Sequence, residues 1–241
     1  TQGIKQSELV ELNTEEPQFD ENQLSKVYSS WEKHFDNIEG GPGRSPKFPI
    51  PNNYQFLLRY AHLSDNHAAL NHVKLTLDKI AYGGIYDHLG GGITRYSTDK
   101  LWKVPHFEKM LYDNGQIVSL YCEAYQKFKD EDYKNLVYGT LEFIERELQS
   151  KEAAFYSALD ADSDGEEGKF YIWKKEELQA LLGEDYELFS DYYNVNRKGY
   201  WEHENYILLR EEDDATLAKK HNLSVEELQA KMAVSEKILM K

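Results

Sequence analysis

Apolar residues recur at helical spacing through most of this chain of 241 residues, and that periodicity limits the folds open to it. The spacing predicts helices over 24–38, 53–63, 67–80, 106–128 and 137–148, with shorter ones near 174–182 and 184–193 and a last one after Ser224. Such helices bury one face against a neighbour. They follow one another in pairs, so the sequence predicts a mainly α array of helical hairpins with β excursions on one face.

Polar residues and glycines mark the expected helix ends. A side-chain oxygen at the N-cap accepts a hydrogen bond from the first turn, and glycine tolerates the left-handed conformation that often follows the last turn. The expected ends are Gly40–Gly41 after the first helix, Asn52 or Asn53 and Asn66 before the next two, and a capping box of Ser224 with Glu227.

The segments between the helices are rich in glycine, proline and aromatic residues. Residues 40–51 hold four of the six prolines and are expected to form an extended loop. Residues 83–105 contain five glycines, and their aromatic content favours a functional loop over disorder. Residues 154–173 are predicted to form a β-hairpin with a long turn, and residues 199–210 a second strand pair.

The charge of the chain excludes some partners. Lys and Arg total 28 against 43 Asp and Glu, a formal charge of −15, which disfavours nucleic acids and anionic membrane surfaces. No run approaches 18 apolar residues. The single cysteine, Cys122, allows no internal disulfide and no CxxC motif, so a reducing, cytoplasmic location is expected. Cys122 lies in an apolar helical run and is expected to be buried and inert.

Residues 1–20 are polar, contain Pro17 and are expected to be a leader or linker. They lack the apolar core of a signal peptide and an initiator Met, which suggests a processed or shortened form. Residues 21–241 are then expected to form the folded domain.

The stretch from Tyr86 to Glu108 concentrates acids, bases and aromatic rings, the groups that sugar-processing sites need. His106 follows Pro105 at an expected helix start, where the helix dipole would lower the pKa of its imidazole toward that of a usable base. The alternative is a glycine-kinked loop whose polar groups satisfy its own backbone.

A second acidic motif, DADSDG from Asp160 to Gly165, matches the opening of a calcium loop. The twelfth position is Tyr171 rather than Glu, which argues against an EF-hand. Three interpretations stay open: a looser calcium site, a carboxylate cluster lining a cleft, and an ordinary acidic turn. No metal-ligand motif or cofactor fingerprint is found, so neither a metal nor a cofactor is expected.

Three motifs together resemble one family. GGPGRSPKFP at 40–49, GGIYDHLGGGITRYSTDKLWKVPHFEKMLYDNGQ at 83–116 and FYSALDADSDGEEGKFYIW at 155–173 are similar to the thioredoxin-domain-containing, spermatogenesis-associated family. The resemblance implies a partial (α/α) toroid similar to N-acylglucosamine 2-epimerases and six-hairpin glycosidases. Residues 21–241 would be the first part of that toroid, without the family's thioredoxin-like domain and its later hairpins.

The resemblance also implies roles for individual residues. The expected catalytic residues are His106, Glu108, Asp87 and His88, with His106 as general base or acid and Asp87 or Glu108 as its partner. Tyr86, Trp102 and Tyr156 would pack on a sugar ring. The other expected substrate-binding residues are Arg44, Lys47, Arg95, Asp113, Asp160 and Asp162.

Two functions follow as expectations. The first is a carbohydrate-active domain, a sugar epimerase or isomerase or a glycoside hydrolase, with a carbohydrate ligand. The alternative is a non-catalytic binding or scaffold module that accompanies a thioredoxin-like domain. Exposed toroid faces would also allow a homodimer.

Overall fold

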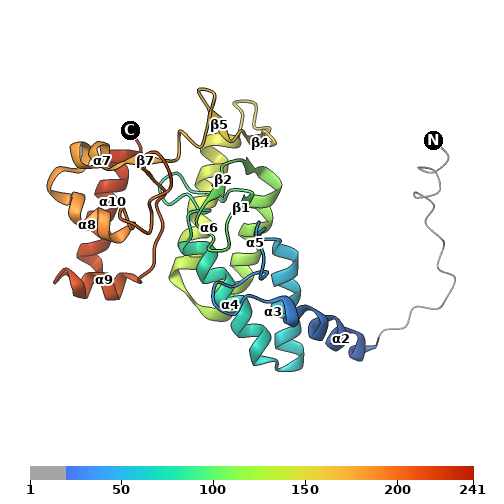
Figure 1. Ribbon diagram of the computed structural model, residues 1–241. Helices are drawn as coiled ribbons and strands as arrows, with labels where there is room; N and C mark the ends of the chain where they lie inside the picture. The colour runs from blue at the N-terminus through green and yellow to red at the C-terminus, as the bar shows by residue number, and fades with distance from the viewer. Residues whose placement is uncertain (1–19) are drawn as a thin grey trace. The chain divides into compact units, whose positions relative to one another are not determined.

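The computed structural model describes residues 20–241 (Figure 1). The chain divides into a short unit that ends at Lys33 and a main unit, His34–Lys241. In the short unit, α2 (Glu21–Trp31) starts at Asp20, whose side chain accepts a hydrogen bond from the Asn22 amide. The predicted leader lies almost wholly outside the described residues.

The first predicted helix was too long. It ends at Trp31, followed by a 3-10 turn (Glu32–His34), and Ile38 is 76% exposed. Gly40 and Gly41 do not cap a helix. Both have positive φ, and a Cβ on Gly40 would lie 2.6 Å from the Thr76 Cα. These glycines therefore allow close packing of the loop.

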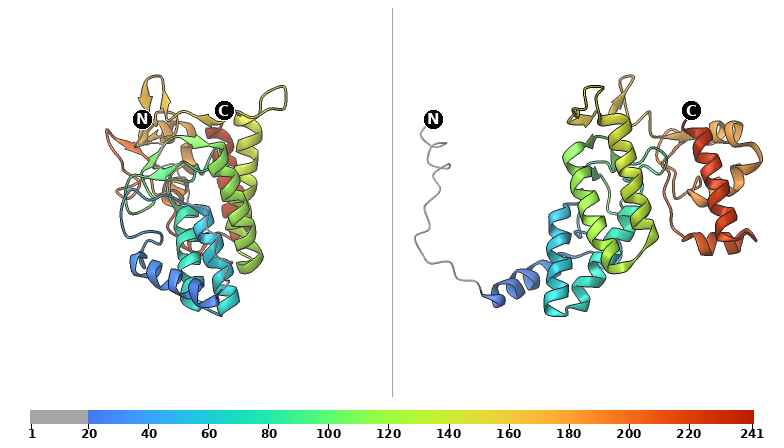
Figure 2. Two further views of the ribbon diagram at one scale, coloured as in Figure 1. Left: turned by 90° about the vertical axis from the view of Figure 1, so that its right-hand side faces the viewer. Right: turned by 180° about the vertical axis from the view of Figure 1, so that it is seen from behind.

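Two helical hairpins form the first part of the main unit, as predicted. The first is α3 (Pro51–Ser64) with α4 (His67–Tyr82), and the second is α5 (Leu111–Phe128) with α6 (Glu131–Phe143), which continues as a π-helical turn, η2 (Ile144–Leu148). Both views of Figure 2 show these helices side by side. Their apolar stripes meet in a core that includes Leu57, Val73, Leu77, Ile80, Ile117, Leu120 and Leu136.

The predicted caps are confirmed in part. Asn66 caps α4, with its side chain accepting from the Ala69 amide. The α3 prediction was wrong, because Pro51 opens that helix and Asn52 and Asn53 lie inside it. Proline suits this first position because its missing N–H would have no partner there.

Residues 83–110 lie between the hairpins and are mostly irregular. β1 (Tyr96–Ser97) pairs antiparallel with β2 (Pro105–His106), and β3 (Lys109–Met110) pairs with β4 (Ala158–Leu159). The predicted helix start at His106 is wrong, because α5 begins at Leu111. Burial alternates from Pro105 to Met110, which is the period of extended chain. No helix starts at His106, so the predicted effect of a helix dipole on this residue is wrong.

The predicted hairpin at 154–173 is also wrong as a single unit. Only β5 (Asp162–Ser163) and β6 (Glu166–Glu167) form a local hairpin. β4 pairs with β3, and β7 (Trp173–Lys174) pairs with β8 (Asn205–Tyr206), which confirms a strand in the 199–210 segment. The 154–173 segment thus pairs with two distant parts of the chain, around β3 and around β8.

The C-terminal helices have a core of their own. They are α7 (Lys175–Leu182), α8 (Tyr186–Tyr192), α9 (Asp214–Lys220) and α10 (Val225–Leu239), with a 3-10 turn, η3 (Gly183–Asp185), between the first two. Leu178, Phe189, Leu217 and Leu228 lie in this core. The capping box of Ser224 and Glu227 forms as predicted.

Arg210 joins the C-terminal helices to the helical hairpins. Its guanidinium lies between the rings of Tyr82 and Tyr192, 4.5 and 4.7 Å from their centroids. It pairs with Asp132 at 3.3 Å and with Asp214 at 2.6 Å. The two tyrosine hydroxyls donate to the same carboxylates, Tyr82 to Asp132 and Tyr192 to Asp214. One nearly buried cation thus connects α4, α6, α8 and α9.

Two further sequence predictions concern the single cysteine and membrane-spanning helices. Cys122 is exposed on α5, so the prediction of a buried thiol is wrong. None of the helices between residues 20 and 241 is long and apolar enough to cross a bilayer.

Candidate functional site

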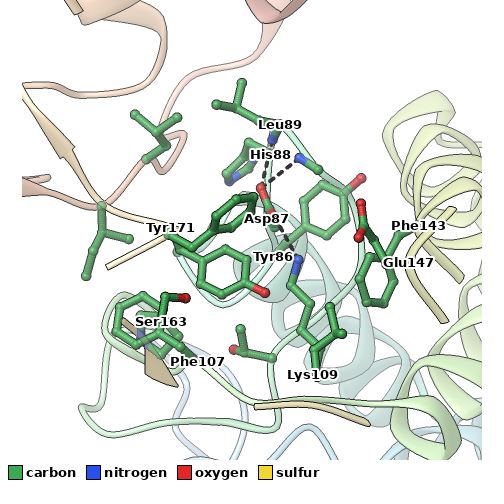
Figure 3. Close-up of a pocket in the computed structure, with 18 of the residues that line it drawn as sticks. Tyr86, Asp87, His88, Leu89, Phe107, Lys109, Phe143, Glu147, Ser163 and Tyr171 are labelled. Carbon is green, nitrogen blue, oxygen red and sulfur yellow. Dashed lines mark hydrogen bonds and ion pairs between the residues drawn. The ribbon is translucent and has the colours of Figure 1, made fainter. Parts of the chain in front are cut away.

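A cavity of about 620 Å³ lies in the main unit, within the range of about 300–1,000 Å³ that is usual for small-molecule sites (Figure 3). Its wall comes from five parts of the chain. These are Tyr86–Gly90 after α4, Phe107 and Lys109 near β3, Phe143, Arg146 and Glu147 at the end of α6, the segment from Leu159 to Trp173, and Ile207, Leu208 and Leu239 from the C-terminal part.

A buried ion pair forms one wall. The Asp87 Oδ2 atom lies 2.7 Å from the Lys109 Nζ atom, and Asp87 Oδ1 accepts hydrogen bonds from the Leu89 and Gly90 amides. Lys109 also donates to the Gly91 carbonyl at 2.8 Å. Burial raises the pKa of Asp87, but the Lys109 charge and these hydrogen bonds outweigh it and hold that pKa below its usual value. The carboxylate is therefore ionised at neutral pH.

Two aromatic rings enclose the Lys109 ammonium group. Its Nζ atom lies 4.5 Å from the ring centroid of Phe143 and 4.6 Å from that of Tyr171. Figure 3 shows these rings on either side of the Lys109 side chain. Burial lowers the pKa of Lys109, although Asp87 opposes this. Hydrogen bonds and cation–π contacts together explain how the protein interior accommodates a lysine that is only 1% exposed.

His88 contributes a neutral imidazole to the cavity wall. Its Nε2 atom lies 3.1 Å from the Gly83 carbonyl, which can only accept, so this nitrogen donates. Burial first, and then the charge of Arg210, lower the pKa of His88 from 6.5 to about 4. At neutral pH the ring is uncharged, and its other nitrogen can accept a proton.

Aromatic side chains supply most of the remaining wall. The rings of Phe107 and Tyr171 stack with centroids 5.8 Å apart, and Tyr86 packs edge-on against His88 at 5.2 Å. Burial raises the pKa of both the Tyr86 and the Tyr171 hydroxyl, so both stay protonated and can donate hydrogen bonds. Rings beside fixed polar groups match the needs of a sugar, which has C–H faces and hydroxyl edges.

The structure brings together five of the residues expected at the site. Tyr86, Asp87, His88, Asp160 and Asp162 all line the cavity. They come from the loop after α4 and from the segment around β5, which are far apart in sequence. The cleft interpretation of the DADSDG motif therefore agrees with its position at the cavity wall.

Other expected site residues lie outside the wall. The His106 ring stacks on Tyr96, with centroids 4.9 Å apart, and its Nδ1 atom is 2.9 Å from a Glu167 carboxylate oxygen. Glu108 pairs with Arg95 at 3.2 Å. Burial raises the pKa of Asp113, on the first turn of α5. None of His106, Glu108, Arg95 and Asp113 contributes to the cavity wall.

Four further residues were expected to face a ligand but do not line the cavity. Trp102 and Lys47 are fully buried. The Trp102 indole donates to the Glu39 carbonyl, and Lys47 pairs with Asp36 at 2.9 Å. Arg44 and Tyr156 are exposed elsewhere on the surface. Trp102 and Lys47 therefore hold loops from the inside, because no face of either side chain is accessible.

Sequence reasoning missed several residues of the wall. Phe143, Glu147 and Tyr171 were not among the expected site residues, and Lys109 matched the family's polar motif without an expected role. Lys109 lies two positions after Phe107 in an extended segment. This spacing could have placed both side chains on one face. Glu147 carried no such signal, since it falls within a segment whose pattern indicates only a helix.

Comparison with known proteins confirms the resemblance in sequence. No family model matches the chain. Spermatogenesis-associated protein 20 from human and from rat is 41% identical over 170 residues, which is 66% of this chain and 22% of the relative. An uncharacterized protein from Caenorhabditis elegans is 32% identical over 249 residues, 91% of this chain and 34% of its own length. The chain spans about a fifth to a third of the length of these curated relatives.

Solved structures show the fold. A sugar epimerase from a ruminal bacterium matches 90% of this chain and 70% of its own, with a TM-score of 0.51 and 14% identity. A cellobiose 2-epimerase from Bacillus thermoamylovorans covers 58% of this chain and 40% of its own, with a TM-score of 0.49 and 16% identity. Identity at this level shows the fold alone. The chain is a mainly α, partial (α/α) toroid of helical hairpins with small β excursions, as predicted.

Proposed function

We propose that this relative of spermatogenesis-associated protein 20 binds a carbohydrate in the cavity beside Asp87 and His88, and acts on it by acid–base chemistry. The observation that carries the proposal is the wall itself, where a neutral imidazole and an ionised carboxylate lie among the rings of Tyr86, Tyr171 and Phe107. The fold supports the same class of ligand, since this chain shares it with a sugar epimerase, but a shared fold is a weaker argument than the site.

The chemistry of the wall favours an isomerase or epimerase over a glycoside hydrolase. Glycoside hydrolysis needs a carboxylic acid that is protonated before it acts. Asp87 is held ionised by Lys109 and two backbone amides, so it does not fit that role. Isomerisation and epimerisation instead need a base that removes a proton next to a carbonyl group, and a neutral imidazole can do so.

In this proposal His88 removes the proton beside the carbonyl group and returns it to the former carbonyl carbon, while a sugar hydroxyl proton moves to the carbonyl oxygen. Asp87 positions the loop that carries His88. The Tyr86 and Tyr171 hydroxyls donate hydrogen bonds to the sugar. The catalytic roles expected of His106 and Glu108 stay predictions, and they require a ligand that extends from the cavity toward β2. Sugar turnover by the alanine variants of His88 and His106 shows which of the two histidines acts on the sugar.

The experiment is ligand-observed NMR with a panel of mono- and disaccharides. We expect saturation transfer to at least one sugar, lost or reduced at least about tenfold in affinity in Tyr171→Ala, because an aromatic platform is removed. Turnover of that sugar should fall by about 10²-fold or more in His88→Ala. His62→Ala is the matched control, since His62 is exposed on α3 away from the cavity. Absence of binding by a folded protein, or binding indifferent to Tyr171→Ala, would contradict the proposal.

A scaffold function is the second candidate, and one observation favours it. Two pairs of charged groups in the wall are partnered within the protein, Asp87 with Lys109 and Arg146 with Glu147. A scaffold would bind no sugar, and substitutions at Asp87 would change stability alone. Sugar binding that is sensitive to Tyr171→Ala decides between the two functions.

A further inference from the structure

The carboxylates of Asp160 and Asp162 at the cavity wall differ from the buried Asp87–Lys109 ion pair, because neither of them has a partner in the described part of the chain. Asp160 and Asp162 line the cavity and are exposed. Within residues 20–241, neither carboxylate makes an ion pair or a side-chain hydrogen bond. Ala161 between them is 5% exposed and packs with Phe107 and Ile207. The chain bends at Ala161, and the residues on either side of it, Asp160 and Asp162, both line the cavity.

The backbone that carries these carboxylates is held firmly. The Ala161 carbonyl accepts a hydrogen bond from the Gly168 amide at 2.9 Å, and Asp162 lies opposite Glu167 in the β5–β6 pair. Gly168 packs so closely that a Cβ there would lie 2.3 Å from the Phe107 ring. Figure 3 shows Phe107 and Ser163 among the residues that line the cavity. The two carboxylates are therefore fixed at its edge.

The cations of the wall do not neutralise these carboxylates. Lys109 is occupied by Asp87 and the Gly91 carbonyl, and Arg146 by Glu147 and the Gly90 carbonyl. His88 is neutral above a pKa of about 4. Of the lining cations in the described chain, only Lys241 lacks a protein partner, against two such carboxylates. The accessible charge of the wall is therefore negative.

We propose that Asp160 and Asp162 select a sugar that carries a protonated amino group. The inference rests on the proposed function, since it names the class of carbohydrate that the same cavity takes. An ammonium group donates three hydrogen bonds, which suits two carboxylates that line one cavity, whereas a phosphate or carboxylate on the ligand is repelled. A metal ion is a poorer occupant, because no group of three His, Cys, Asp or Glu residues within 20–241 could hold one.

The test compares dissociation constants of sugars that differ at one substituent. The probes are glucose, glucosamine, N-acetylglucosamine and glucose 6-phosphate, with the mannose and galactose counterparts, at low and high salt. We expect each amino sugar to bind about two- to fivefold tighter than its parent at low salt, the size expected for exposed ion pairs. N-acetylation should remove this advantage, because it removes the charge, and salt should reduce it. The 6-phosphates should bind more weakly than the parent sugars.

The variants locate the effect. In Asp160→Asn with Asp162→Asn, the ratio of the amino-sugar affinity to the parent-sugar affinity should fall to about one. Asp164→Asn is the matched control, because Asp164 lies in the same turn but outside the wall and should leave the preference unchanged.

Three results would overturn the inference. The first is equal binding of amino and parent sugars by the native protein. The second is tighter binding of a sugar phosphate, above all if Lys241→Ala abolishes it. The third is calcium binding that the double asparagine variant removes. These results leave the proposed function standing. If no sugar binds a folded protein, the proposed function itself fails, and the inference fails with it.

Discussion

At the scale of single residues, burial sets the protonation of two histidines. The pKa of His72, like that of His88, is lowered from 6.5 to about 4. Burial is the main cause for both rings. Lys47 also lowers the pKa of His72, and Asp36 opposes it. The His72 ring stacks on Phe35 with centroids 3.7 Å apart, and its buried Nδ1 atom has no hydrogen-bond partner. The folded protein therefore keeps both rings neutral.

These shifts predict a loss of stability as the pH falls. The unfolded chain takes up protons near pH 6.5, and the folded chain does so only near pH 4. Stability is thus full above pH 6.5 and declines as the pH falls toward 4, by up to about 3 kcal/mol for each histidine. Asp36, whose pKa is lowered to about 2, contributes only at lower pH.

The measurement is urea unfolding at pH 7 and pH 4.5 for the native protein and His72→Phe. Phenylalanine keeps the stacked ring and cannot be protonated, so the variant should lose about half as much stability over this interval. His62→Phe, at an exposed position on α3, should behave like the native protein. The account of His72 is wrong if the native protein and His72→Phe lose equal stability.

At the scale of elements, the glycine turn after α4 is shaped by α6. Gly91 has φ +73°, and a Cβ there would lie 2.1 Å from the Gly139 carbonyl oxygen. The same turn provides the Gly91 carbonyl that accepts from Lys109. Gly115 in α5 is different, because nothing lies within 4 Å of its Cβ position. Packing against α6 therefore requires a glycine at position 91, whereas a side chain would fit at position 115.

Alanine at these two positions should therefore act in opposite directions. Gly91→Ala should destabilise the protein by more than about 1 kcal/mol, since positive φ and the clash both oppose a side chain. Gly115→Ala should stabilise it by about 0.5–1 kcal/mol, the gain for alanine over glycine inside a helix. Denaturant midpoints at constant slope give both values. Equal effects of the two substitutions would show that packing against α6 does not constrain the turn.

At the scale of the whole main unit, the cavity depends on how the C-terminal helices are joined to the hairpins. Tyr86 and His88 follow α4, whereas Ile207 and Leu208 come just before Arg210. The Arg210 backbone amide donates to the Tyr82 carbonyl at 2.7 Å, and its side chain bridges Asp132 and Asp214. The position of Arg210 thus sets the distance between two walls of the site.

Arg210→Met should cost about 3–5 kcal/mol of unfolding free energy, because it leaves two carboxylates in a partly buried site without their cation. It should also raise the pKa of His88 from about 4, since the Arg210 charge is the second cause of the low value. Histidine NMR titration gives that pKa. Arg197→Met, at an exposed position, is the control for both measurements. An unchanged His88 titration in folded Arg210→Met would contradict the electrostatic link.

Local features of the sequence were enough to predict most helices. The periodicity of α4, α5 and α6, the Asn66 cap and the Ser224–Glu227 capping box depend on residues within a few positions of one another. The motif at 83–116 indicated the family and placed Asp87 and His88 near a site. Fold class and hairpin order are therefore properties of the sequence itself.

Pairing over long distances decided the rest. The chain around His106 is extended because Tyr96 and Ser97 pair with it, and Trp102 is buried because Gly41 leaves room for its ring. The wall of the cavity joins Lys109 to Tyr171 and Glu147, which no local pattern connects. Strand pairing and burial depend on partners far along the chain, whose positions exist only once the helices have packed. For that reason the sequence determined most of the helices, and the tertiary structure determined the strands and which side chains meet in the site.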